Sequence, residues 1–324
     1  MALPTWKDVD EARERIAGMA HRTPVMTCAA IDRETGAQVF FKCENFQRTG
    51  SFKFRGAANA VASLSVAERV RGVITHSSGN HAQALALAAR LHGVVATVIM
   101  PENSVFVKRQ ATERYGATVV SCAPTLAARE ETTAELIRQT KATFVHPHDD
   151  AHVISGQGTA AWELVSETGF LDLVLAPVGG GGLLAGTALA VRHLLPDARV
   201  IGCEPAGADD AYRSLKSGTR VTELAPDTLA DGLRTVLGEI DFSIIKSEIF
   251  DIVRVADEAI LAAMRFIWER MKIVIEPSSA VAVAPLLDGS LGASGLRIGV
   301  ILSGGNVNLD RVFSADWTAK PRSH

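Results

Sequence analysis

The chain has 324 residues, which suits about two domains of ordinary size and a large buried core. Hydrophobic residues make up 47% of it and charged residues 21%, which excludes a disordered chain, and a net charge of −3 gives no electrostatic basis for binding nucleic acid. Its four cysteines lack the CxxC spacing of metal fingers, so we expect reduced thiols and a cytoplasmic protein.

The order of predicted elements alternates between strands and helices. Residues 1–16 predict a capped amphipathic helix without the apolar core of a signal peptide. Strands starting near residues 72, 94, 117 and 142 then alternate with helical stretches over residues 81–93, 107–116 and 126–140. Strands near 171 and 198 enclose a helix over residues 183–195, and a last strand starts near 296. Residues 173–191 carry no charge, but Pro177 and four glycines would break a membrane-spanning helix, so we expect no membrane span.

This alternation predicts an α/β fold in which helices cover both faces of parallel sheets. We expect two three-layer domains, a larger one formed by residues 1–71 and 148–324 and a smaller, mobile one formed by residues 72–147. Ligands of such sheets bind at the carboxyl ends of the strands. We expect residues 317–324 to be frayed.

Three strand ends carry glycine-rich turns, at Ser77–His81, Gly179–Gly182 and Ser303–Asn306. Four successive glycines between a strand and a helix let backbone N–H groups converge on an anion, and a phosphate group is the natural candidate. A Walker loop is excluded because Leu183 and Leu184 follow the glycines where lysine and a hydroxyl residue are required.

A dinucleotide-binding fold remains an alternative at the second turn. Gly180, Gly182 and the later Glu204 imitate its fingerprint, in which the acid binds a ribose. The third glycine, Gly186, stands one position late, however, and this alternative leaves Lys53 and the Ser77–His81 turn unexplained.

Lys53 lies between two phenylalanines in the stretch "GSFKFRG". Burial among apolar residues lowers the pKa of a lysine, so its neutral amine becomes a nucleophile that can form a Schiff base with an aldehyde cofactor. A phosphate-binding turn, such a lysine and a hydroxyl at a distant strand end together suggest pyridoxal phosphate.

At these residues the sequence resembles the fold type II pyridoxal-phosphate enzymes, whose fold is like that of the tryptophan synthase β subunit. Within them it is most similar to the branch of serine racemase and the threonine/serine dehydratases. Cysteine synthases are less similar, because here the strings read "SSGNH" and "SFKFRG". The matching strings are "CENFQRTGSFKFRG", "THSSGNHAQALA", "ISGQGT", "PVGGGGLLAG", "EPAGADDAY", "ADGLRT", "IEPSSA" and "LSGGN". They cover nearly the whole chain.

The resemblance implies a role for each matching residue. Lys53 would hold the cofactor covalently and act as the base on the α-proton, and Ser78 would be the second proton-transfer residue on the opposite face. Ser77, Asn80 and His81 would surround the substrate carboxylate. The implied cofactor contacts are Phe52 on the pyridine ring, Asn80 at the 3-oxygen, Gly179, Gly180, Gly181 and Gly182 at the phosphate, Ser303 at the pyridine nitrogen, and Glu276 in the same site.

The string "EPAGADD" resembles the divalent-cation site of the family. It implies Glu204, the carbonyl of Ala208 and Asp210 as ligands of a hard ion such as Mg²⁺, Mn²⁺ or Ca²⁺. Without the resemblance, these acids could equally cap a helix and lie in a solvated turn.

Two departures from the nearest relatives bear on the substrate. "HPHDD" puts His148 at the expected substrate end, where serine racemase carries an amide. "ADGLRT" puts Arg234 in a loop facing the cofactor, where its guanidinium could bind a second carboxylate and so favour 3-hydroxyaspartate. Alternatively, Arg234 pairs with an acid at the domain edge.

We therefore expect a dehydratase that converts serine, threonine or 3-hydroxyaspartate to a 2-oxo acid and ammonia. The chain ends soon after "SGGN", which leaves no room for a regulatory domain and favours a catabolic role. The resemblance also implies a homodimer. The alternatives are a serine or aspartate racemase, which Ser78 permits, an NAD-dependent dehydrogenase, and a cofactor-binding module without catalysis.

Overall fold

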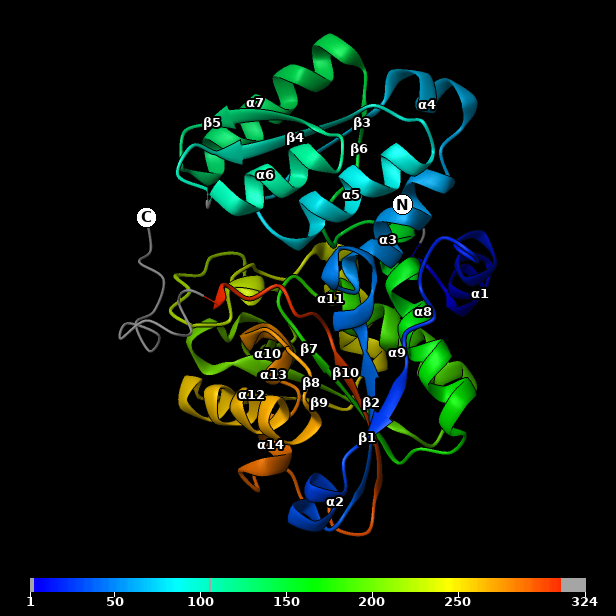
Figure 1. Cartoon of the computed structure of the whole chain (residues 1–324), viewed down its shortest axis with the longest axis vertical. Helices are drawn as coiled ribbons and strands as arrows, with labels where there is room; N and C mark the ends of the chain where they lie inside the picture. Colours follow the sequence, from blue (N-terminus) through cyan, green and yellow to red (C-terminus); the bar gives the residue numbers. More distant parts are fainter. Residues whose placement is uncertain (1–2, 105, 310–324) are drawn as a thin grey trace.

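The computed structural model describes residues 3–104 and 106–309, which form two β-sheets covered by helices. Figure 1 shows the smaller sheet with its helices at one end of the molecule and the larger sheet at the other. The expected frayed tail lies outside the described residues.

The larger sheet has six strands, all of them parallel except for the antiparallel pair β1–β2. Its central strands are continuous apolar runs, as expected for strands buried on both faces. In sheet order the strands are β1 (Val25–Thr27), β2 (Gln38–Cys43), β10 (Arg297–Leu302), β7 (Leu173–Pro177), β8 (Arg199–Pro205) and β9 (Asp251–Val255).

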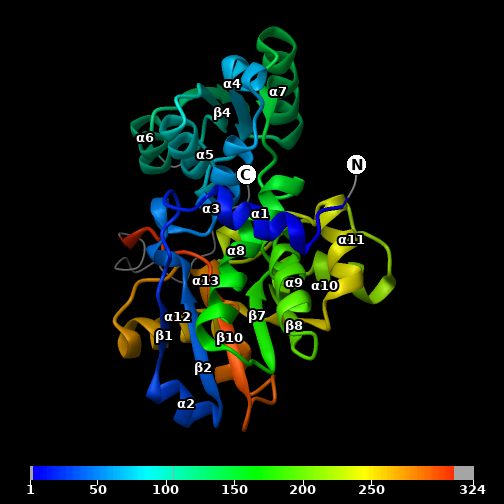
Figure 2. The same cartoon turned by 90° about the vertical axis from the view of Figure 1, so that its right-hand side faces the viewer.

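Helices cover both faces of this sheet, because alternate side chains of the strands enter two separate apolar clusters. One face carries α1 (Trp6–Arg15), α8 (Ala151–Thr168), α9 (Gly182–Leu194), α10 (Asp210–Ser217) and α11 (Glu239–Glu248). The other carries α2 (Ala29–Thr35), α12 (Asp257–Met271), α13 (Pro277–Ala280) and α14 (Ala284–Leu287). Short 3₁₀ turns are η1 (Glu44–Phe46), η2 (Arg48–Gly50), η3 (Ala206–Ala208) and η4 (Asp231–Leu233). Figure 2 shows α1 lying across the side of the molecule that holds α8 and α9.

The smaller sheet has four parallel strands. In order these are β5 (Thr118–Cys122), β4 (Ala96–Pro101), β3 (Val73–His76) and β6 (Thr143–Phe144). Its helices are α3 (Lys53–Ala62), α4 (Val66–Arg71), α5 (Asn80–Leu91), α6 (Phe106–Arg114) and α7 (Leu126–Thr140). The side chains of α3 and α5 share one apolar cluster with β3 and β4, and α7 packs on the other face.

The predicted α/β class with two parallel-rich sheets is confirmed. Each strand and helix named from the sequence is present, while β1, β2 and β9 were not predicted. The boundaries at residues 72 and 147 and the mobility of the smaller domain remain predictions. The helix α3 belongs to the apolar cluster of the smaller sheet although it precedes residue 72, because Phe54, Ala57 and Val61 pack against α5.

Within the described residues, no helix combines the length and apolar character that crossing a membrane requires. All four cysteines are free and buried, as expected for reduced thiols.

Candidate active site

Lys53 is held where β10 ends. The backbone N–H of Phe52 donates to the carbonyl of Ser303 at 3.0 Å, and Ser51 forms an antiparallel bridge with Gly304. The strands β10 and β7 are parallel neighbours. This attachment therefore brings the lysine to the carboxyl ends of the strands, where β7 leads into the glycine turn.

The amine of Lys53 has one hydrogen bond and one aromatic neighbour. Its Nζ donates to the carbonyl of Pro147 at 2.7 Å and lies 5.1 Å from the centre of the Phe52 ring. Burial lowers the pKa of Lys53 from 10.5 to about 8, against the opposing effect of Asp241 and Glu276. A sizeable share of the amine is therefore neutral near physiological pH, as the sequence predicted. Phe54 points away into the apolar core and is fully buried.

The Ser77–His81 turn leads from β3 into α5. The backbone N–H of Gly79 donates to Ser77 Oγ at 3.3 Å, and the helix begins at Asn80. The ring of His81 is buried, its Nδ1 has no partner among the described residues, and burial holds its pKa well below 6.5. The turn therefore combines the first amides of a helix with a neutral imidazole.

Asn80 joins two segments that lie far away in the sequence. Its Nδ2 donates to Glu276 Oε1 at 2.9 Å, and its Oδ1 accepts from Asn306 Nδ2 at the same distance. Burial raises the pKa of Glu276 to about 8, and the negative charge of Asp231 adds to the effect. Asn306, from the string "LSGGN", was not singled out in advance. Its hydrogen bond explains why the turn after β10 needs an amide.

The glycine turn Gly179–Gly182 lies between β7 and α9. Gly181 has φ +108°, a backbone conformation that favours glycine. A Cβ on Gly179 would lie 2.8 Å from Leu233 Cα, and a Cβ on Gly180 would lie 2.3 Å from the imidazole of His148. Glycine is therefore favoured by close packing as well as by the turn itself, and no side chain of the N-cap residue occupies the first amides of α9.

His148 and Asp241 form a buried pair beside this turn. The distance from His148 Nδ1 to Asp241 Oδ2 is 2.8 Å. Burial lowers the pKa of His148 to about 3 and raises the pKa of Asp241 well above 3.8, so burial disfavours the charged form of both side chains. Asp241 was missed from the sequence, because nothing in "GEIDFS" marks one acid in a helix as a partner of a histidine far away.

Arg234 directly follows η4, the segment that contacts Gly179. Its Nη2 donates to the carbonyl of Pro226 at 3.0 Å. No ion pair of Arg234 occurs among the described residues, so the pairing with an acid that we considered from the sequence is not found. Its side chain is partly exposed. One nitrogen of the guanidinium is thus held by the backbone.

The acids of "EPAGADD" are buried around the start of α10. Glu204 accepts the backbone N–H groups of Ala211 and Tyr212, both at 2.8 Å, which is the helix-capping role that we considered. Asp210 Oδ2 accepts from the N–H of Leu237 at 2.9 Å, whereas its Oδ1 has no partner among the described residues. With both oxygens of Glu204 engaged by the backbone, the ribose contact of the dinucleotide alternative has no support.

A buried ion network near Lys53 was also missed. Arg55 binds Glu44 through Nε at 2.7 Å and Glu163 through Nη1 at 2.8 Å, and Lys42 Nζ lies 2.6 Å from Glu163. Lys42, Glu44 and Arg55 are fully buried. Glu44 and Arg55 lie inside the matching string "CENFQRTGSFKFRG", but no local pattern shows that they meet.

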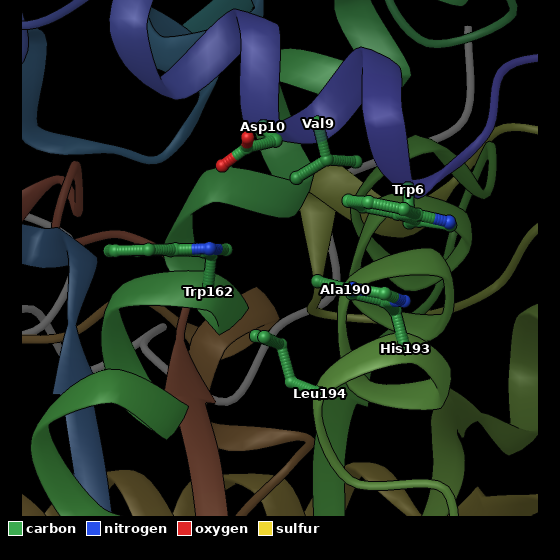
Figure 3. A pocket seen from close by; sticks show the side chains of 7 residues that line it. All are labelled: Trp6, Val9, Asp10, Trp162, Ala190, His193 and Leu194. Atoms are coloured by element: carbon green, nitrogen blue, oxygen red, sulfur yellow. The ribbon is translucent and has the colours of Figure 1, made fainter.

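A hollow that Lys53 does not line lies between α1, α8 and α9 (Figure 3). The indole of Trp6 stacks on the imidazole of His193 with ring centres 3.5 Å apart. The residues that line the hollow are Trp6, Val9, Asp10, Trp162, Ala190, His193 and Leu194. None of them was predicted as a site residue.

Comparison with known proteins gives consistent results. Residues 16–304 match the model of a family described as pyridoxal-phosphate dependent enzyme. The chain is 46% identical over 312 residues to a beta-hydroxyaspartate dehydratase of Paracoccus denitrificans, covering 96% of this chain and 99% of that protein. It is 47% identical over 316 residues to a serine racemase of Dictyostelium discoideum, covering 96% and 98%. The crystal structure of serine racemase from Dictyostelium discoideum superposes with a TM-score of 0.91, covering 95% of this chain and 100% of that one.

Proposed function

Because the chain belongs to the family of pyridoxal-phosphate dependent enzymes, we propose that it is a dehydratase of 3-hydroxy amino acids, and that its preferred substrate is 3-hydroxyaspartate. The products would be a 2-oxo acid and ammonia: one water leaves the substrate, and one water is then taken up to release the ammonia. The name of the Paracoccus relative supports this reaction, and the position of Arg234 supports the substrate.

The residues around Lys53 fit pyridoxal phosphate. The primary amine has a lowered pKa, and the glycine turn at the start of α9 excludes side chains and offers backbone N–H groups to a phosphate. When bound, the cofactor withdraws electrons from the substrate and so acidifies the α-proton. The residues that would hold the cofactor are Lys53, Phe52, Asn80, Gly179–Gly182, Glu276 and Ser303.

Lys53 would take the α-proton, since burial lowers its pKa to about 8 and a sizeable share of the amine is neutral near physiological pH. Ser77, the first amides of α5 and the neutral ring of His81 would bind the α-carboxylate. Asn80 would be oriented for its contact by Glu276 and Asn306. These residues orient the substrate so that the α-proton faces the lysine.

Arg234 carries the substrate proposal. It follows a segment packed on Gly179, and its guanidinium is anchored by the carbonyl of Pro226. A planar guanidinium binds a carboxylate with two parallel hydrogen bonds, so a substrate with a second carboxylate would gain a contact that serine and threonine lack.

A racemase is the second candidate, supported by Ser78 in the turn before α5. A hydroxyl on the face opposite Lys53 could return a proton to the α-carbon from the other side. The serine racemase of Dictyostelium discoideum is as similar to this chain as the dehydratase of Paracoccus denitrificans.

We also propose the cation site at the start of α10. Glu204 and Asp210 are hard oxygen donors, and the unpartnered Oδ1 of Asp210 together with the buried Ala208 suits Mg²⁺, Mn²⁺ or Ca²⁺. No cluster of three His, Cys, Asp or Glu side chains with metal-binding spacing occurs in the described ranges, so the ion would need the backbone carbonyl and water. A homodimer likewise remains a proposal from the resemblance.

The experiment measures 2-oxo acid formation from the isomers of 3-hydroxyaspartate, from both enantiomers of serine and from threonine, with and without Mg²⁺. We expect kcat/KM to be highest for one 3-hydroxyaspartate isomer. Arg234→Met should lower it about 100-fold for that substrate and change it little for serine, because only the charged contact is lost. Chiral chromatography separates elimination from racemisation. Faster turnover of serine or threonine by the wild type would overturn the substrate proposal.

A further inference from the structure

The pair formed by His148 and Asp241 docks two distant segments beside the glycine turn. His148 follows the smaller sheet, and Asp241 lies in the first turn of α11. Next to the pair, Asp149 accepts the backbone N–H groups of Glu239 at 3.0 Å and Ile240 at 2.8 Å. The start of α11 is thus fixed to the 148–149 segment by one side-chain pair and two capping hydrogen bonds.

The glycine turn is enclosed by this pair. A Cβ on Gly180 would lie 2.3 Å from Cδ2 and 2.5 Å from Nε2 of His148, and a Cβ on Gly181 would lie 2.6 Å from Asp241 Cβ. The carbonyl of Gly180 accepts the N–H of Gly238 at 3.0 Å, just before α11. The outer side of the turn is therefore packed and hydrogen-bonded, and the first amides of α9 are left for a ligand.

Burial disfavours a charge on either member of this pair. It raises the pKa of the Asp241 carboxyl well above 3.8, with Asp149 adding to the effect, and it lowers the pKa of the His148 imidazole to about 3, with Lys53 adding to the effect. An ionised carboxylate so close to the turn would repel a phosphate in a medium of low dielectric constant. A neutral pair can hold the turn without that repulsion.

We propose that Asp241 and His148 are positioning residues for phosphate binding: they hold Gly180 and Gly181 in the conformation that directs the first N–H groups of α9 at the cofactor phosphate. The hydrogen bond between His148 Nδ1 and Asp241 Oδ2 fixes the orientation of the imidazole, and the imidazole packed on Gly180 fixes the conformation of the turn. The inference rests on the proposed function only in taking the cofactor phosphate as the ligand of this turn, and it is independent of the substrate.

The test compares three ligands on the cofactor-free protein: pyridoxal phosphate, pyridoxal and inorganic phosphate. His148→Phe keeps a ring against Gly180 but removes the hydrogen bond, and Asp241→Leu removes it from the other side. Both should weaken the binding of pyridoxal phosphate and inorganic phosphate about tenfold and change the affinity for pyridoxal less than about twofold. Asp241→Asn, which keeps a hydrogen-bonding group, should stay within about threefold of the wild type.

Asp172→Asn is the matched control. Asp172 directly precedes β7, at the end of that strand opposite the glycine turn, and accepts the N–H of Arg297 at 2.8 Å. It should leave all three affinities unchanged. Unchanged phosphate binding in His148→Phe, or equal losses for pyridoxal phosphate and pyridoxal, would overturn the inference. If Asp241→Leu fails to fold, His148→Phe and Asp241→Asn decide. Failure of the wild type to bind pyridoxal phosphate would instead reject the proposed cofactor chemistry.

Discussion

At the scale of single residues, Lys53 shows how a charged side chain becomes reactive. Its amine donates to one backbone carbonyl, lies near the Phe52 ring and loses hydration through burial. Desolvation outweighs the attraction of Asp241 and Glu276, so the net effect is a pKa lowered to about 8. A lysine in water has a pKa of about 10.4 and would be almost wholly protonated at neutral pH.

The first prediction concerns the pH dependence of this amine. The rate at which the cofactor-free protein combines with pyridoxal phosphate should rise with pH and level off above about 8, because only the neutral amine reacts. Stopped-flow absorbance of the lysine-bound cofactor measures this rate. Lys53→Ala should lose the absorbance change entirely. A rate that continues to rise toward the pKa of an ordinary lysine would contradict the lowered value.

The carboxyls at the start of α10 allow a second prediction. Burial raises the pKa of Glu204 from 4.5 to about 8 and that of Asp210 from 3.8 to about 6. Both folded values lie above the unfolded ones. Their contribution to stability is therefore full below pH 3.8, the lower unfolded value, and is lost as pH rises through about 6 and about 8.

A bound cation would replace the lost protons. We expect Mg²⁺ or Ca²⁺ to raise the melting temperature by several degrees at about pH 9 and hardly at all at about pH 5. Asp210→Asn should abolish the effect. Asp209→Asn should retain it, since the neighbouring Asp209 pairs with Arg213 and Arg254 instead. An equal shift at both pH values, or none, would argue against the site.

At the scale of elements, glycines set the distance between three helices. A Cβ on Gly156 of α8 would lie 2.6 Å from Gly56 Cα of α3, and a Cβ on Gly158 would lie 2.7 Å from the carbonyl oxygen of Gly186 in α9. The backbones of α3, α8 and α9 therefore touch without side chains between them. Because α3 begins at Lys53 and α9 begins at the glycine turn, this contact helps to set the two halves of the site.

The third prediction tests this contact. Gly156→Ala should lower the free energy of unfolding by about 3 kcal/mol, because the new methyl group meets backbone atoms that cannot move aside. Gly292→Ala is the control: a Cβ there meets nothing within 4 Å, and the change should stay within about 0.5 kcal/mol. Urea unfolding monitored by circular dichroism measures both. Equal stability of the two variants would show that the helices can separate without loss.

At the scale of the whole molecule, the buried ion network joins parts of both sheets. Arg55 belongs to α3, which packs with the smaller sheet. Its partners belong to the larger sheet and its helices: Lys42 lies in β2, Glu44 directly follows β2, and Glu163 lies in α8. The N-terminal segment joins through the carbonyl of Thr23, which accepts from Lys42 Nζ at 2.5 Å. Each charge has a partner, which is the condition for burying it.

The fourth prediction follows from that condition. Arg55→Met should lower the free energy of unfolding by about 3–5 kcal/mol, because Glu44 and Glu163 lose their shared cation. Arg265→Met should leave it unchanged within the error of the measurement, since Arg265 pairs with Glu269 on the exposed surface of a helix. Urea titration of both variants provides the comparison. Wild-type stability of Arg55→Met would mean that the network contributes little.

Much of the site follows from local patterns. Glycine turns, apolar strands and the lysine between two phenylalanines depend on backbone conformation and periodicity, which neighbouring residues determine. The class of fold and the strands β3 to β8 and β10 were predicted on this basis and are confirmed. The family was predicted from the resemblance of the matching strings and is also confirmed. The short β1 and the partly buried β9 were missed because neither forms a long apolar run, and β2 was missed although most of its residues are buried.

The sequence by itself determined the local motifs, namely the lysine between two phenylalanines and the glycine turns, because neighbouring residues set them. That Lys53, the glycine turn and the turn before α5 belong to one site was implied by the resemblance to the family and stays a prediction. Only the tertiary structure decided what surrounds them: Asp241 beside His148, Asn306 beside Asn80, Glu163 beside Arg55. The strand order β1-β2-β10-β7-β8-β9 brings those partners together across long stretches of chain. Such contacts depend on which strands become neighbours, and no local pattern of residues contains that choice.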